Sequence, residues 1–128
     1  MRWTLGTDWD LDIERGPEWL IVHVASLHPL YPADQELRLA QKLFEICERH
    51  LTWRIVVDIQ RLPLLTSYLI GQLVLLEKRL RERGGVLRLS GLSDEQVAML
   101  RLNRLDSRLA CYDTPQDAIL GWIRSKPR

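Results

Sequence analysis

Apolar and polar residues alternate near the start of the chain, with apolar side chains at Trp9, Leu11 and Ile13. A Gly-Pro pair at 16–17 supplies a turn, and a second run follows at 19–25 that is rich in β-branched residues. Alternation with a period of two, a turn and a second apolar run are typical of two paired strands. The sequence therefore predicts a β-hairpin over about 9–25.

The next segment, about 32–51, has a helical period. Its apolar positions are spaced three or four residues apart, or multiples of that, with charged residues between them: Leu37, Ala40, Leu43, Phe44, Cys47 and Leu51. This spacing predicts an amphipathic helix that covers one face of a sheet.

The run at 54–59 is almost wholly apolar and β-branched, as suits a strand of a parallel sheet with both faces buried. We expect it at the centre, with Ile55, Val57 and Ile59 in the core. Packed over them we expect four apolar residues of the flanking helices: Leu43, Phe44, Leu73 and Leu76. After a loop at 60–65, Ser67 is a candidate N-cap for a helix that runs through Leu80 and ends at the Gly-Gly pair 84–85.

The remaining third of the chain predicts two strands and two helices. A strand is expected at 86–90, and Ser93 with Gln96 forms a capping box for a helix that extends to about residue 105. A short strand at 110–112 precedes Thr114-Pro115, which starts a last helix that extends to residue 122. Strands that alternate with helices predict an α/β fold with a mostly parallel central sheet, an N-terminal β-hairpin and about four helices. We expect residues 1–128 to form one domain.

Composition narrows the function classes. The 18 Lys and Arg residues against 17 Asp and Glu give a net charge of only +1, which argues against nucleic acid as a partner. The start of the chain is charged and has no apolar signal segment, so we expect a cytoplasmic protein. The uncharged run 62–76 is too short to cross a membrane, and we interpret it as a buried loop and helix. The two cysteines, Cys47 and Cys111, have no metal or disulfide spacing and are expected to pack as small core residues.

In open α/β sheets, ligands and partners are met where strands end and helices begin. Three such loops are expected, at 26–32, 60–67 and 91–93. The second places the hydroxyls of Thr66 and Ser67 at a helix N-terminus, where free N–H groups favour an acceptor oxygen or an anion. On these residues alone, Ser67 is better explained as a plain N-cap than as a binding site.

Catalysis and metal binding find little support. Ser67, Asp58 and either His23 or His28 can be combined on paper into a hydrolase triad, but the chain has no G-x-S-x-G turn. The histidines lack a second ligand at helical spacing, so we expect no metal and no other cofactor.

Three longer segments resemble the STAS family of anti-sigma factor antagonists. They are IVVDIQRLPLLTSYLIGQL, LEKRLRERGGVLRLSGLS and RLDSRLACYDTPQDAI, within the stretch from Arg54 to Ile119. The resemblance lies in a strand that ends in Asp, a loop that ends in a serine, a long helix, a glycine before the next strand, and a short strand that leads into a helix.

This resemblance implies a protein-binding regulator rather than an enzyme. Ser67 falls on the serine that a partner kinase phosphorylates in family antagonists, and Asp58 on the acidic residue that closes the central strand. Thr66 stands where the family commonly has Asp, and Leu69 where it commonly has Gly. Thr66 is therefore a second candidate phospho-acceptor.

The implied partner is an anti-sigma factor or a serine kinase-like protein, released when phosphorylation adds charge. The alternative is an interaction module that is not phosphorylated, such as a stressosome-like scaffold or the STAS subunit of a lipid ABC transporter; self-association is left open. We expect exposed side chains to border the partner site at Tyr68 and Gln72 on the second helix and at Leu92 in the loop after the next strand. The full set of expected partner-binding residues adds the end of the central strand and the two helix starts: Asp58, Thr66, Ser67, Tyr68, Gln72, Leu92 and Ser93.

Overall fold

Six strands form one sheet in the order in which they occur along the chain. They are β1 (Arg2–Leu5), β2 (Trp9–Arg15), β3 (Leu20–Ser26), β4 (Arg54–Asp58), β5 (Val86–Ser90) and β6 (Ala110–Tyr112). The first three pair antiparallel, whereas β3, β4, β5 and β6 pair parallel to one another. The computed structural model describes residues 2–5, 9–26, 39–62 and 65–121, and the α/β class and mostly parallel sheet expected from the sequence are confirmed.

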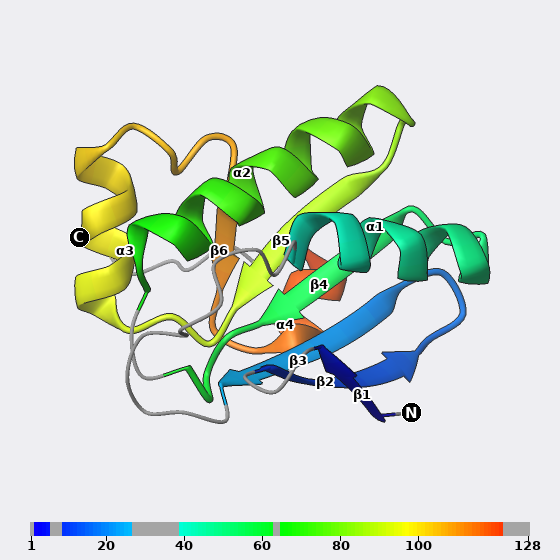
Figure 1. The fold of residues 1–128 in the computed structure, drawn as a ribbon. Coiled ribbons are helices and arrows are strands. Elements are labelled where there is room, and N and C mark those ends of the chain that lie inside the picture. The colour runs from blue at the N-terminus through cyan, green and yellow to red at the C-terminus, as the bar shows by residue number, and fades with distance from the viewer. Residues whose placement is uncertain (1, 6–8, 27–38, 63–64, 122–128) are drawn as a thin grey trace.

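Four helices occur in the described ranges: α1 (Leu39–His50), α2 (Ser67–Glu82), α3 (Asp94–Leu102) and α4 (Pro115–Leu120). Each segment between consecutive parallel strands contains one of the first three (Figure 1). None of these helices is long and apolar enough to cross a membrane.

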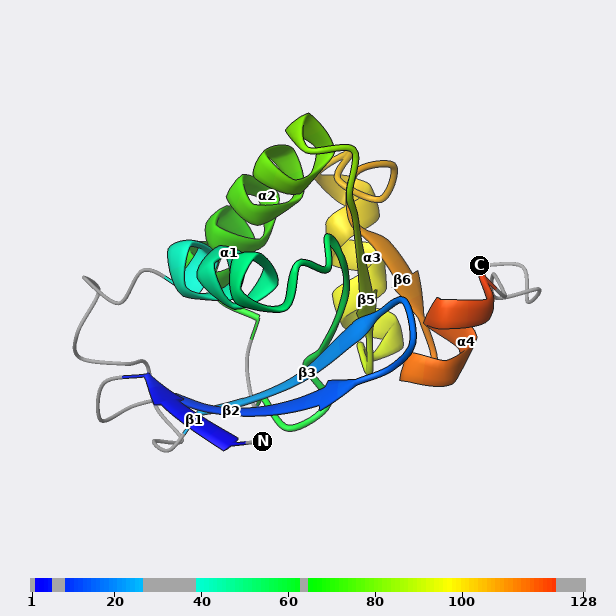
Figure 2. The same ribbon diagram turned by 90° about the vertical axis from the view of Figure 1, so that its right-hand side faces the viewer.

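The sheet separates two apolar clusters of unequal size. On one face, α1, α2 and α3 pack over the larger cluster, whereas the short α4 lies on the opposite face (Figure 2). Alternation along β4 divides its side chains accordingly, because Ile55 and Val57 enter the larger cluster and Val56 the smaller. The expected burial of Ile59 and of the helix residues packed over the strand is confirmed: Leu43, Phe44, Leu73 and Leu76.

Several element boundaries differ from expectation. β1 was not expected from the sequence, and it pairs with β2 from Arg2 opposite Asp12 to Leu5 opposite Trp9. The third helix ends at Leu102 rather than near 105, because Asn103 caps it and the chain then turns through Arg104, whose φ is 57°. The expected start of the first helix, before Leu39, and Trp122 at the end of the last helix lie outside the described residues.

Candidate functional site

The N-cap of α2 is Thr66 and not Ser67. The backbone of Thr66 is extended, and its Oγ1 atom accepts a hydrogen bond of 3.1 Å from the Leu69 amide, which is the geometry of an N-cap. The assignment of Ser67 as the cap is therefore wrong by one residue. Ser67 is the first residue of the helix, it is exposed, and the cap bond is made without its hydroxyl.

Ser67 begins an exposed ridge along α2. The exposed positions Ser67, Gly71 and Leu75 recur every four residues, and Lys78 continues the same side of the helix. Leu75 keeps 44% of its surface exposed although the helix is otherwise packed over the core. A shallow hollow follows this ridge and is lined by Gly71, Val74, Leu75, Lys78, Arg81 and Arg108.

The expected exposed patch around Tyr68, Gln72 and Leu92 is corrected by the structure. Leu92 is only 4% exposed, because the loop after β5 folds it into the larger core. Tyr68 is half-buried against the same core. The Oε1 atom of Gln72 accepts a hydrogen bond of 2.9 Å from the Ala40 amide, so this side chain joins α2 to α1.

Ser93 is exposed, and its side chain has a structural role. Its Oγ accepts from the Gln96 amide at 3.2 Å, while the Gln96 side chain accepts from the Ser93 amide at 2.9 Å. The capping box predicted from the sequence is thus confirmed at the start of α3.

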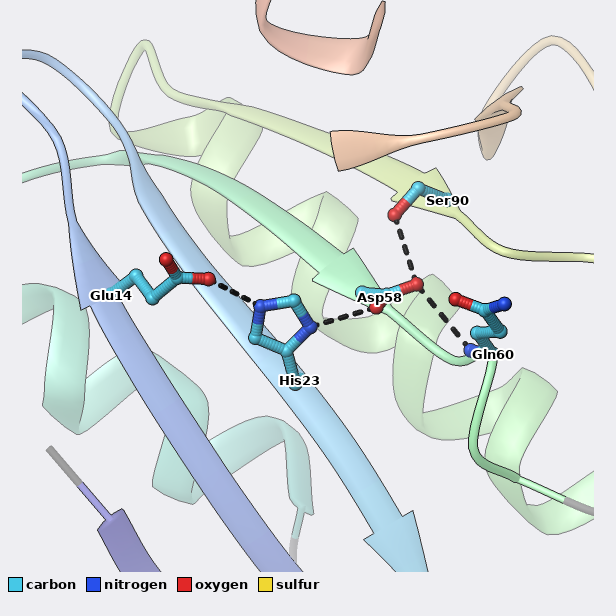
Figure 3. A network of polar contacts seen from close by, with 5 residues as sticks. All are labelled: Glu14, His23, Asp58, Gln60 and Ser90. Atoms are coloured by element: carbon cyan, nitrogen blue, oxygen red, sulfur yellow. Dashed lines mark hydrogen bonds and ion pairs between the residues drawn. The ribbon is translucent and has the colours of Figure 1, made fainter. Parts of the chain in front are cut away.

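Asp58, expected at the partner site, is 5% exposed and lies within a polar network at the end of β4 (Figure 3). Its Oδ2 atom lies 2.7 Å from Nδ1 of His23. Its Oδ1 atom accepts a hydrogen bond of 3.2 Å from the buried Ser90 hydroxyl and one of 3.4 Å from the Gln60 amide. Side chains alternate along β4, so Asp58 points to the same side of the sheet as Val56 and away from Val57. Val56 belongs to the smaller cluster and Val57 to the larger, and the network therefore lies on the α4 side of the sheet.

His23 connects this network to the hairpin. Its Nε2 atom lies 2.5 Å from Oε2 of Glu14, so the ring stands between two carboxylates. Burial by itself lowers the pKa of His23, but the hydrogen bonds and charges of Glu14 and Asp58 outweigh that effect and raise the pKa above 6.5. Ionised carboxylates only accept hydrogen bonds, so both contacts are made at once only by the imidazolium, which has two N–H groups.

Gly91 allows the loop after β5 to close over this network. Its φ is +80°, and a Cβ atom at this position would lie 2.5 Å from Oδ1 of Asp58 and 2.7 Å from the Gln60 amide nitrogen. Only a residue without a side chain fits such an approach, which brings the ends of β4 and β5 together.

The described residues do not assemble the triad considered from the sequence. His23 does contact Asp58 through Nδ1, as the triad required, but its Nε2 atom, which would have to meet the serine, contacts Glu14 rather than Ser67. No group of three or more His, Cys, Asp or Glu in the described ranges is placed to hold a metal ion. Burial raises the pKa of Cys47 to about 12, so this thiol is inert, whereas Cys111 is only half-buried.

The link from Glu14 to His23 was missed at the level of sequence. One signal was present, since Glu14, His23 and Asp58 are polar positions on three segments expected to be strands. The register of the strands brings these three residues together, because it sets Asp12 opposite His23 and His23 opposite Asp58. This register cannot be predicted from periodicity alone.

Comparison with solved structures shows the fold. No family model and no curated protein matches the sequence. A Thermotoga maritima protein described as an anti-sigma factor antagonist superposes with a TM-score of 0.70 at 18% identity, over 87% of this chain and 92% of that chain. An anti-sigma factor antagonist (STAS) domain protein from Planctomyces limnophilus gives 0.58 at 22% identity, over 87% and 96%. The phosphorylated form of the Bacillus cell fate determinant SpoIIAA gives 0.60 at 16% identity, over 87% and 97%.

The fold is therefore that of the STAS domain, as the resemblance in sequence implied. At these identities the likeness to the anti-sigma factor antagonist structures is one of fold.

Proposed function

We propose that this chain is an anti-sigma factor antagonist-like regulator that binds a protein partner and is switched by phosphorylation of Ser67. The observation that carries the proposal is the position of Ser67. It is exposed at the first turn of α2, and Thr66 makes the cap bond that would otherwise occupy its hydroxyl. A phosphorylated relative of the same fold, SpoIIAA, adds support.

The partner in this proposal is a serine kinase-like anti-sigma factor that contacts the outer face of α2. Ser67, Gly71 and Leu75 supply an exposed ridge with a small and an apolar residue, and Lys78 closes it with a positive charge. This ridge replaces the patch of Tyr68, Gln72 and Leu92 as the proposed contact surface. Asp58 is too deeply buried to contribute a side chain to it.

The switch is a phosphoryl transfer. The kinase moves the γ-phosphoryl group of ATP to Oγ of Ser67, the hydroxyl proton leaves to a base of the kinase, and ADP is released. The phosphate adds about −1.5 to −2 charges at neutral pH. At the N-terminus of α2 this charge is tolerated by the fold, but at a contact that excludes water it opposes binding.

Thr66 is the second candidate acceptor in this proposal. Its hydroxyl is engaged in the cap of α2, so phosphorylation there has to break a bond that holds the helix start. We therefore favour Ser67, and we expect modification of Thr66 to cost stability as well as binding.

The decisive experiment incubates the purified chain with ATP and a serine kinase-like anti-sigma factor from the same organism, and maps phosphate by mass spectrometry. We expect one phosphate, on Ser67 in the wild type, and none in Ser67→Ala. Thr66→Asn is the matched variant, because asparagine preserves an N-cap but cannot accept a phosphate. It should be modified like the wild type.

A chain that binds this protein without being modified would favour the alternative, an interaction module such as a stressosome-like scaffold or a transporter subunit. The replacement of the family's usual Asp by Thr66, which removes a carboxylate beside the serine, is the observation that supports this reading.

A further inference from the structure

Four residues form a continuous polar chain from the hairpin to the end of β4. It runs from Glu14 on β2 through His23 on β3 to Asp58 on β4, and from Asp58 to the Gln60 amide, over distances of 2.5, 2.7 and 3.4 Å (Figure 3). Its last member, Gln60, lies in the segment that leads from β4 to Thr66 and Ser67.

Backbone hydrogen bonds connect the residues around Gln60 to the end of β5 and to one another. The Ile59 amide donates to the Ser90 carbonyl at 3.0 Å, and the Leu62 amide donates to the Ile59 carbonyl at the same distance. The Gln60 amide has the Asp58 carboxylate as its acceptor. The position of that carboxylate therefore helps to set how this turn leaves the sheet.

Protonation of His23 decides how firmly Asp58 is held. The charged side chains that face the ring, among those described, are all acidic: Asp12 and Glu14 on β2 and Asp58 on β4. The imidazolium donates to Glu14 and Asp58 together, whereas the neutral ring has one N–H and donates to only one of them. Loss of the proton also removes the positive charge that separates Asp58 from Glu14.

We propose that His23 and Asp58 are positioning residues for the segment that leads to Ser67, and that His23 acts as a proton-sensitive link between the hairpin and this segment. With the ring charged, Asp58 is fixed and the Gln60 amide is protected; with the ring neutral, the turn at 59–62 opens more often. The consequence for Ser67 rests on the function proposed above, but the response of the turn does not.

The test follows His23 and the turn in the same sample. The imidazole nitrogens of His23 are titrated by nuclear magnetic resonance from pH 5 to 9, and hydrogen exchange of the Gln60 amide is measured at each pH and corrected for its intrinsic pH dependence. We expect Gln60 protection to fall by about threefold or more, with the same midpoint as His23.

Glu14→Gln is the informative variant, because Glu14 is exposed and its removal should leave the fold intact. It should move the His23 midpoint and the Gln60 response together to lower pH. Glu18→Gln is the matched control on the same hairpin, with an exposed carboxylate that contacts Arg54 instead, and should move neither. The link is overturned if His23 titration and Gln60 protection have different midpoints in the wild type. It is also overturned if the midpoint of Gln60 protection does not move in Glu14→Gln.

The effect at Ser67 is tested separately with the kinase-like partner of the proposed function. The ratio of phosphorylation rates, wild type over Glu14→Gln, cancels the pH dependence of the kinase itself. We expect it to change by about threefold at pH values between the two His23 midpoints and to be near one outside them. A ratio of one at every pH overturns the positioning role. If neither protein is modified, the proposed function fails, while the exchange measurement still decides the link.

Discussion

The Nδ1 atom of His23 lies 2.7 Å from Oδ2 of Asp58, which joins the end of β4 to its neighbour β3 through two side chains. The pKa of His23 is raised above 6.5 in the folded chain, so the folded state binds the proton more tightly than the unfolded state. The resulting stabilisation is fully present below pH 6.5 and is lost as the pH rises through the folded pKa.

We therefore expect the free energy of unfolding to fall by about 1 kcal/mol from pH 6 to pH 9, the size of one lost hydrogen bond. Urea denaturation at both values measures it. His23→Gln should reduce this difference, whereas His50→Gln, at the end of α1, should keep it. If the free energy of unfolding fell by the same amount between pH 6 and pH 9 in the wild type and in His23→Gln, His23 would not be the titrating group.

Thr66 and Ser67 should differ in their effect on stability. Thr66→Ala deletes the N-cap bond to the Leu69 amide and should cost about 1 kcal/mol. Ser67→Ala removes an exposed hydroxyl that caps nothing and should stay within about 0.5 kcal/mol of the wild type. Thermal melts of both variants, with Thr66→Asn as the cap-preserving control, decide whether Thr66 or Ser67 caps α2. A larger loss in Ser67→Ala would contradict the assignment of Thr66 as the cap.

Gly91 should not tolerate a methyl group. In Gly91→Ala the new Cβ would meet Oδ1 of Asp58 at 2.5 Å and would also hold a φ of +80°, so we expect a loss of roughly 3 kcal/mol or more. Gly71→Ala is the contrasting substitution, because a Cβ there meets nothing within 4 Å and α2 should gain about 1 kcal/mol. The two melting temperatures should move in opposite directions.

How much of this could be foreseen depends on whether a feature is local. The strand at β4 and the capping box of α3 were predicted, because a β-branched run and a Ser-x-x-Gln spacing carry their own physical reason. The cap of α2 was placed one residue late, since Thr66 and Ser67 are adjacent and both suit an N-cap.

Features that depend on tertiary contacts were not foreseen. Leu92 was expected at the surface because it lies in a loop, yet the packing of that loop over the core buries it. The contact of His23 with Glu14 requires the register between β2 and β3, which local sequence does not determine.

The central strand should not accept a charge. Val57 is fully buried between its neighbours on β3 and β5, and Val57→Asp would place an unpaired carboxylate among apolar side chains. Such a burial costs several kcal/mol, on the order of the whole stability of a domain, so we expect the variant to be unfolded at 25 °C. Arg54→Asp changes an exposed residue of the same strand and should melt within a few degrees of the wild type. Circular dichroism of the pair checks the assignment, and a folded Val57→Asp would contradict it.

The proposed switch predicts that Ser67→Asp separates binding from stability. A negative charge at the first residue of α2 interacts favourably with the helix dipole by about 0.3 to 1 kcal/mol, so the melting temperature should stay within a few degrees of the wild type. Binding to the kinase-like partner should weaken at least tenfold, which corresponds to about 1.4 kcal/mol, because the charge falls on the exposed ridge of Ser67, Gly71 and Leu75. Ser67→Ala should still bind.

Gln116→Asp adds the same charge to the first turn of α4, on the opposite face of the sheet, and should leave the affinity unchanged. Calorimetric titration of the four proteins tests the contact surface: equal affinity in Ser67→Asp and the wild type would place the partner elsewhere.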